Sequence, residues 1–233
     1  MRSMLLALAL SALALTIPTE GRATCAAPRA EPPLLVTPTG STVPAGGVVL
    51  VYLSTDAEAY QFVLVAQGTQ TRVPMTRRAI TSRLYALEVP AATSPGTHAI
   101  EARRPDRGSG GPYSPGAIVV GGALPSASLA APRGRIVVRE TPGRWSPNQS
   151  ASLVLQGPVP SEAAVVFRWT DASGEHGNAR WLVAGEDAVM VASGHCGTYP
   201  FGTTVPSAGQ RVEVAFVDAR GTLGPVTTLA VGR

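Results

Sequence analysis

LLVTPTGSTVPAGGVVLVYL, residues 34–53, and VVRETPGRWSPNQSASLVLQ, residues 137–156, are two versions of one pattern in this chain of 233 residues. In both, a Thr-Pro pair and a later proline precede an apolar run. That run covers residues 48–53 in the first version and 151–155 in the second. Self-similarity of this kind is typical of a duplicated structural unit, so the sequence predicts two similar modules in tandem.

Two later matches follow in the same order. AYQFVLV at 59–65 aligns with AVVFRWT at 164–170, and GTHAIEARRPDRG at 96–108 aligns with GQRVEVAFVDARG at 209–221. The offset then widens, which indicates an insertion in the second copy around residues 193–201. The stretch at 121–132 is uncharged and rich in Gly, Ala, Ser and Pro, as linkers are. We therefore expect a signal peptide at 1–23, an N-terminal extension at 24–32, modules at 33–121 and 133–233, and a linker at 122–132.

The apolar residues of each copy alternate with a period of two, which is the period of a half-buried strand. Phe62 and Leu64 alternate with Gln61 and Val63, for example. Strands are predicted at 33–37, 48–54, 59–66, 70–75, 82–89, 97–104 and 116–121 in the first copy, and at 134–140, 151–157, 163–170, 177–183, 187–192, 210–218 and 225–231 in the second. Seven short strands between Gly, Pro and Asp turns predict an all-β, antiparallel β-sandwich for each module.

Two local features support this interpretation. Asp218-Ala219-Arg220-Gly221 suits a tight turn, because Asp opens such turns and Gly accepts a positive φ. Trp169 shares a strand face with Val165 and Phe167, so we interpret it as a core residue rather than as a platform for a ligand.

Each copy resembles the bacterial immunoglobulin-like domains of secreted and surface proteins. The segment TPTGSTVPAGGVVLVYL (37–53) is similar to their Pro-Gly turn and hydrophobic second strand, and AFVDARGTLGP (215–225) is similar to their last hairpin. The resemblance implies two tandem immunoglobulin-like β-sandwich domains. It implies no single activity, since such domains adhere, space and present other modules.

The composition excludes several classes of protein. The chain is 45% hydrophobic but only 15% charged, with 25 Gly and 21 Pro, which argues against a coiled coil or a charged disordered chain. All 19 of its cationic residues are Arg, which indicates a bacterium with a GC-rich genome. The formal charge of +4 is therefore weak evidence for a nucleic-acid partner, and we predict none.

The N-terminus has the pattern of a secretory signal peptide. Arg2 precedes the apolar run MLLALALSALALTI at 4–17, which is too short for a membrane-spanning helix of about 20 residues. Small residues at Gly21 and Ala23 favour cleavage before Thr24. No later segment is long and apolar enough to span a bilayer, so we expect an exported protein of the periplasm, cell surface or extracellular space.

Two cysteines, Cys25 and Cys196, follow the leader. Arg22 and Thr24 do not fit the lipid-attachment signal that a cysteine at this position suggests. An exported protein with two cysteines most simply pairs them, so we predict a disulfide that would hold the second module beside the first. Two unrelated thiols, or a bond from Cys25 to a second chain, remain as alternatives.

No motif in the chain indicates catalysis. His195 adjoins Cys196, and neighbours on an extended strand point to opposite sides, which is poor geometry for a dyad. His98 and His176 show no zinc spacing with the cysteines. The segment 171–177 resembles a calcium loop only loosely, and we prefer a polar hairpin turn. We therefore predict a non-enzymatic protein without a metal or cofactor.

Arginines and a few aromatic residues are the candidate contact residues. Arginines gather in three groups, which together suggest a basic face for anionic polysaccharide or lipid headgroups: Arg77, Arg78 and Arg83; Arg103, Arg104 and Arg107; Arg133, Arg135, Arg139 and Arg144. Solvated strand faces explain these arginines equally well. Four aromatic residues of loops or edges are candidates for sugar or protein contacts, or for packing between the modules: Tyr113, Trp145, Trp181 and Tyr199.

The leading functional hypothesis is an exported interaction or adhesion module that presents its surfaces to a protein or a surface glycan. A carbohydrate-binding accessory protein is the alternative from another class, and a two-domain periplasmic chaperone is a third. The sequence does not predict the oligomeric state.

The signal peptide generates a direct prediction. N-terminal sequencing of the mature protein is expected to begin at Thr24 or within a few residues of it, because the apolar run ends in a small-residue cleavage site. An intact Met1 on protein extracted from membranes would contradict this expectation.

Overall fold

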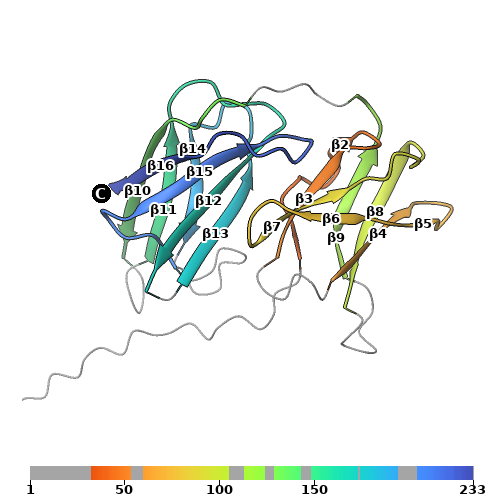
Figure 1. Ribbon diagram of the computed structural model, residues 1–233, viewed down its shortest axis with the longest axis horizontal. Helices are drawn as coiled ribbons and strands as arrows, with labels where there is room; N and C mark the ends of the chain where they lie inside the picture. Colours follow the sequence, from red (N-terminus) through yellow and green to blue (C-terminus); the bar gives the residue numbers. More distant parts are fainter. Residues whose placement is uncertain are drawn as a thin grey trace, which may run out of the picture.

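The computed structural model describes residues 33–53, 60–104, 113–123, 129–142, 148–172, 174–193 and 204–232. Within these ranges the regular secondary structure consists of β-strands alone. The strands form two β-sandwiches that lie side by side (Figure 1). No helix that could cross a membrane occurs in the described part of the chain. The predicted signal peptide and both cysteines lie outside it.

The first sandwich consists of two sheets. One has the strand order β1-β3-β7-β6, with β1 at Leu34–Leu35, β3 at Val48–Tyr52, β7 at Leu84–Glu88 and β6 at Thr76–Ala79. The other has the order β2-β9-β8-β4-β5, with β2 at Thr42–Val43, β9 at Tyr113–Val120, β8 at Gly96–Arg103, β4 at Gln61–Ala66 and β5 at Arg72–Pro74. All pairings are antiparallel except that of β2 with β9.

The second sandwich repeats this order. Its strands run β13-β12-β15-β16-β10-β11-β14, and β16 joins the two layers by pairing antiparallel with β15 and parallel with β10. The bounds are β10 Gly134–Thr141, β11 Asn148–Leu155, β12 Ala164–Asp171, β13 Gly174–Trp181, β14 Ala188–Ser193, β15 Arg211–Val217 and β16 Thr227–Gly232.

The two sandwiches share one strand order, except that β6 has no counterpart among the described strands of the second. Strands β10 to β16 take the places of β1/β2, β3, β4, β5, β7, β8 and β9, and in both the first strand pairs parallel with the last. A four-stranded layer β1-β3-β7-β6 facing a layer built on β9-β8-β4 is the immunoglobulin-like arrangement. The predicted fold class, two tandem immunoglobulin-like antiparallel β-sandwiches, is confirmed.

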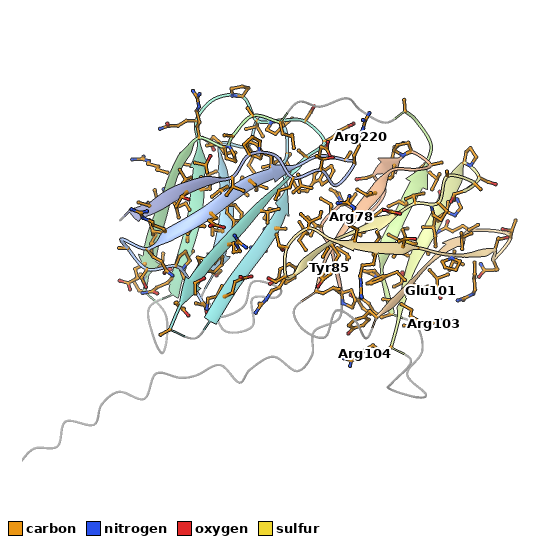
Figure 2. All side chains as sticks on the ribbon, in the orientation of Figure 1. Arg78, Tyr85, Glu101, Arg103, Arg104 and Arg220 are labelled. Carbon is orange, nitrogen blue, oxygen red and sulfur yellow. The ribbon has the colours of Figure 1, made fainter. Side chains whose placement is uncertain are left out.

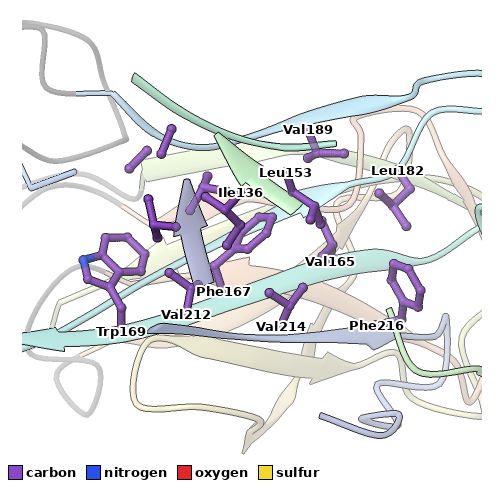
Figure 3. Packing of buried hydrophobic residues seen from close by; sticks show 14 of the residues in the cluster. Ile136, Leu153, Val165, Phe167, Trp169, Leu182, Val189, Val212, Val214 and Phe216 are labelled. Atoms are coloured by element: carbon purple, nitrogen blue, oxygen red, sulfur yellow. The ribbon is translucent and has the colours of Figure 1, made fainter. Parts of the chain in front are cut away.

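Alternation along the strands builds one core inside each sandwich. In the first, Phe62 and Leu64 point inward, as their spacing predicts, toward Val49, Val51 and Ile100. In the second, Val165, Phe167 and Trp169 of β12 pack with residues of β10, β11, β14 and β15 (Figure 3). Trp169 is only 5% exposed, so its interpretation as a core residue is confirmed.

The predicted strands are all present, and two short strands were not predicted. β2 has only two residues, which is too short for a periodic signal. β6 contains Arg77 and Arg78 and has no alternating apolar face. The local sequence pattern gives no information on either strand. Each is formed by its pairing with a neighbouring strand, β2 with β9 and β6 with β7.

Phe167 tests the core of the second sandwich. Replacing it with Ala removes a side chain that is 1% exposed, so urea unfolding is expected to show a loss of about 3–5 kcal/mol in the free energy of unfolding of that sandwich. Val226→Ala, at a residue 54% exposed, is the control and should stay within about 0.5 kcal/mol of the parent. Equal losses from the two variants would show that β12 does not build the core.

Candidate functional site

A third apolar cluster lies between the sandwiches, and we call it the junction cluster. Its buried residues come from β3 and β7 and their surroundings on one side, and from β12, β13 and β15 on the other: Val36, Val48, Leu50, Tyr52, Leu84 and Ala86, with Ala164, Val166, Ala179 and Val217. It joins positions more than a hundred residues apart in the sequence. The sandwiches therefore share a continuous apolar contact in addition to their covalent connection.

The alternation of strand residues explains how β3 serves two clusters at once. Val49 and Val51 point into the core of the first sandwich, whereas Val48, Leu50 and Tyr52 point into the junction cluster. All five residues of β3 are buried as a result. On the facing side, β12 directs Val165 to its own core and Ala164 and Val166 to the junction cluster.

The turn at 218–221 closes one end of the junction cluster. Asp218 Oδ1 accepts hydrogen bonds from the backbone N–H groups of Arg220, at 2.9 Å, and Thr222, at 2.8 Å. Gly221 has a φ of +70°, as the sequence predicts for this turn. A Cβ atom at Gly221 would lie 3.0 Å from the Ala86 side chain and 2.9 Å from an Arg78 nitrogen. Glycine is therefore required here by conformation and by space.

Arg78, in the first sandwich, donates hydrogen bonds to this turn. Its Nη2 donates to the carbonyl of Arg220 at 3.2 Å, and its Nη1 and Nη2 each lie 3.3 Å from the carbonyl of Gly221. The backbone N–H of Val48 also donates to the carbonyl of Ala219 at 3.3 Å. Figure 2 labels Arg78 and Arg220 along the boundary between the two sandwiches. These contacts satisfy carbonyl groups that the turn leaves outside a sheet.

Polar contacts surround the opposite side of the junction cluster. The Tyr52 hydroxyl donates to the carbonyl of Gly177 at 3.0 Å and accepts from Arg83 Nη1 at 3.4 Å. The Ser82 hydroxyl donates to the Glu175 carboxylate. An apolar centre with a hydrogen-bonded rim is the usual anatomy of a specific interface.

Four side chains close one end of the first sandwich, and we call them the arginine–tyrosine cluster: Tyr60, Arg77, Tyr85 and Arg104. The guanidinium carbon of Arg77 lies 5.3 Å from the centre of the Tyr85 ring, and that of Arg104 lies 5.3 Å from the centre of the Tyr60 ring. Arg77 Nη1 also donates to the carbonyl of Tyr60 at 3.4 Å. Such cation–π contacts orient both guanidinium groups.

Other arginines interact with nearby acidic side chains. Glu101 accepts from Arg72 at 2.7 and 3.1 Å and lies 3.7 Å from Arg103. The hydrogen bond that Arg168 donates to Glu213, and the negative charge of that carboxylate, raise the pKa of Arg168. Burial lowers the pKa of Arg180, against an opposing effect of Glu186.

The structure does not gather the three arginine groups onto one face. Arg78 and Arg83 contact the junction, whereas Arg103 and Arg104 lie at the lower end of the first sandwich in the view of Figure 2. Arg133, Arg135 and Arg139 lie on or beside β10 and are exposed. Arg107 and Arg144 fall outside the described residues. A single basic face across all three groups is therefore wrong, because strand pairing distributes them over separate surfaces.

Two of the four candidate aromatic residues are described. Tyr113, the first residue of β9, is 40% exposed and available for contacts. Trp181, the last residue of β13, is half-buried and packs against the junction cluster, which agrees with the alternative of packing between modules. Trp145 and Tyr199 lie outside the described residues, and their roles stay predictions.

The described histidines occupy structural positions. His98 is buried, with Nε2 2.9 Å from the carbonyl of Ser94. His176 Nε2 lies 2.9 Å from Asp171 Oδ1, and the His176 ring stacks on Trp169 with centroids 5.7 Å apart. Asp171 pairs with Gly174 at the end of the β12–β13 hairpin, so the polar-turn interpretation of 171–177 is confirmed. No cluster of three metal-ligating side chains occurs among the described residues.

No protein-family model and no curated protein sequence matches the chain. Solved structures resemble it at low identity, with 88% of this chain covered in each case. One is SGBP-B of the Bacteroides ovatus mixed-linkage glucan utilization locus, in complex with a mixed-linkage heptasaccharide (11% identity, TM-score 0.28, 45% of that chain covered). The others are the FN1–FN3 domains of chicken CNTN1 (10%, 0.27, 67%) and a two-domain fibronectin type III segment of chicken tenascin (13%, 0.27, 99%).

The TM-scores are low, so the strand order described above does not rest on these likenesses. The chain spans less than half the length of the SGBP-B chain that it matches. The resemblance to immunoglobulin-like tandem proteins is one of architecture.

The sequence analysis did not predict the apolar contact between the sandwiches that forms the junction cluster. The available signal is the unbroken apolar run of residues 48–53, since an antiparallel strand with one solvated face alternates instead. The contacts of Arg78 left no comparable signal, because main-chain carbonyls have no sequence signature.

Tyr52 tests the polar rim. Tyr52→Phe keeps the ring in the junction cluster and leaves the Gly177 carbonyl without this donor, so chemical denaturation should show a loss of about 0.5–1.5 kcal/mol. Tyr113→Phe, at an exposed residue, is the matched control and should change stability by less than about 0.5 kcal/mol. A Tyr52→Phe variant as stable as its control would argue against the contact.

Proposed function

We propose that this protein is an exported, non-enzymatic interaction module whose two immunoglobulin-like sandwiches form one rigid unit. In this role the unit presents its surfaces to a protein or a surface glycan. The observation that supports the proposal best is the junction cluster, in which ten buried residues from the two sandwiches pack together. Domains that share an extensive apolar interface keep a fixed orientation, whereas domains joined only by a linker move independently.

The nature of the contacts supports rigidity further. The junction combines apolar burial with directional hydrogen bonds from Arg78, Tyr52 and Val48 to backbone carbonyls of the second sandwich. Backbone carbonyls are fixed by their sheets and turns, so each bond restrains both position and angle. Sliding of one sandwich over the other would break several of these bonds together.

A rigid pair suits recognition better than catalysis. At one end of the first sandwich, the described residues offer half-buried guanidinium groups and tyrosine rings held together by cation–π contacts. Arg and Tyr are residue types enriched at contact surfaces. A carbohydrate-binding accessory role remains the alternative, with Tyr113, Trp145 and Tyr199 as the aromatic residues that would contact a sugar. For the boundaries, we keep sandwiches at 33–121 and 133–233 with a linker at 122–132.

The leader and the cysteines complete the proposal. Cleavage before Thr24 would deliver the chain to an oxidising compartment, where Cys25 and Cys196 would pair. Such a bond would restrain the two sandwiches in addition to the junction cluster. It is a proposal drawn from the sequence, as is export itself.

Ala86→Arg tests the rigid unit. Ala86 is fully buried and its side chain faces the junction cluster, so an arginine there introduces a charge into the interface and leaves the core of the first sandwich intact. Small-angle scattering is expected to show a larger radius of gyration, and limited proteolysis should cut faster within residues 121–132.

Ala188→Arg is the matched control, because Ala188 is an exposed residue of the edge strand β14. It should leave both readouts unchanged. Circular dichroism of both variants should retain the strand signal, which separates opening of the junction from unfolding. If Ala86→Arg scatters like its control, the rigid unit is refuted.

A further inference from the structure

An open groove lies at the far end of β4 and β8 from the arginine–tyrosine cluster. Its walls are the β4–β5 turn, at residues 66–71, and the segment 92–98 that leads into β8. The groove has a volume of about 310 Å³, at the lower end of the range for small-molecule sites. Strands β4, β5 and β8 stand on the side of the first sandwich away from the second (Figure 1), so the junction leaves this end open.

The lining of the groove mixes polar and apolar atoms and carries no Asp, Glu or Arg, in a chain with 19 arginines. Beside the buried imidazole of His98, hydroxyl and amide groups supply its accessible polar side-chain atoms: Gln67, Thr69, Thr71, Ser94 and Thr97. Each of these side chains can both donate and accept hydrogen bonds. Small apolar side chains fill the space between them. The groove is therefore suited to a neutral ligand with many hydroxyl groups and poorly suited to an ion.

Hydrogen bonds hold the two walls in place. The backbone N–H of Gln67 donates to the carbonyl of Thr97 at 3.0 Å, which ties the turn to the opposite segment. The hydroxyls of Thr69 and Thr71 lie 3.0 Å apart, and one donates to the other. Buried His98 contacts the carbonyl of Ser94 at 2.9 Å and anchors the second wall. The groove is thus preorganised, which lowers the cost of binding.

Two further features describe the walls. Gln70 has a φ of +56°, which is a common conformation in the loop of a β-hairpin. Thr93 is 8% exposed, and its hydroxyl has no hydrogen-bond partner among the described residues. This oxygen is fully buried, so a ligand in the groove would contact the exposed side chains of Gln67, Thr69 and Ser94 instead.

From these observations we infer that the groove binds a neutral saccharide, as a single sugar or the end of an oligosaccharide. Sugar hydroxyls both donate and accept, as the threonine, serine and glutamine side chains of the walls do. The site goes beyond the proposed function, since it needs neither the junction cluster nor the aromatic residues of the loops. A failure to bind saccharide would leave the rigid unit untouched, and an opened junction would leave the groove intact.

The test is a titration of the mature chain, labelled with ¹⁵N, followed by two-dimensional NMR. The probes are glucose, galactose and mannose, with maltotriose, cellotriose and mannotriose as their oligomers and glucuronate as the charged comparison. Saturable shifts in the millimolar range are expected for at least one neutral saccharide at the backbone amides of 67–71 and 93–98. Glucuronate should shift these amides less, because the groove offers no cation to its carboxylate.

Thr71→Val and Thr97→Val remove one hydroxyl each at nearly constant volume. Each is expected to weaken binding about fivefold to tenfold, which corresponds to the loss of one hydrogen bond. Thr76→Val, at an exposed position of β6 outside the groove, is the matched control and should bind as the parent does. Well-dispersed spectra with unchanged melting temperatures show that all three variants fold.

Three outcomes would overturn the inference. One is the absence of saturable shifts with every neutral saccharide, and a second is shifts that map to other surfaces, such as Tyr113. The third is binding that Thr71→Val and Thr97→Val leave unchanged while both remain folded.

Discussion

Burial of β3 on both faces is the constraint on which the rest of the structure depends. In an antiparallel sandwich each sheet usually has one face on the core and one in water. Here the sheet β1-β3-β7-β6 lies between two apolar layers, the core of its own sandwich and the junction cluster. Any movement that separated the sandwiches would expose Leu50 and Leu84, which are each 1% exposed, to water. The hydrophobic effect therefore acts on the arrangement of the two bodies as well as on each fold.

The polar contacts around the junction explain why one arrangement is selected. Apolar burial is non-directional, and it would tolerate many orientations of two flat sheet faces. The guanidinium of Arg78 is planar with fixed donor directions, so it recognises the carbonyls of the 218–221 turn in one geometry. Gly221 lets the turn approach the sheet closely enough for this contact, since a side chain there would collide with Ala86. Shape and hydrogen bonding thus specify what burial stabilises.

The strands, the 218–221 turn and the position of Trp169 could be predicted because each depends on local pattern. The alternation of apolar residues predicts that Phe62 and Leu64 point inward, as they do. Asp218 and Gly221 are the residues that form the 218–221 turn, and both are recognisable in the sequence. The junction depends on which surfaces meet, and no periodicity carries that information. Val48–Leu53 contained a partial signal, because a run without polar residues fits a strand covered on both sides. The grouping of arginines in the sequence wrongly suggested one basic face, because sequence neighbours can point in different directions. Arg77 contacts the Tyr85 ring, whereas Arg78 contacts the second sandwich.

The shared sheet face has a consequence for biogenesis. Ribosomes complete residues 33–121 before β12 and β15 exist, so the first sandwich emerges with Val48, Leu50, Leu84 and Ala86 uncovered. A contiguous apolar sheet face on a nascent or translocating chain is a site of misassembly with other copies. The long separation in sequence between the two halves of the contact prolongs this interval. A chain of this design therefore benefits from a holding chaperone during synthesis, and truncation after the first sandwich would leave an apolar sheet face uncovered and prone to self-association.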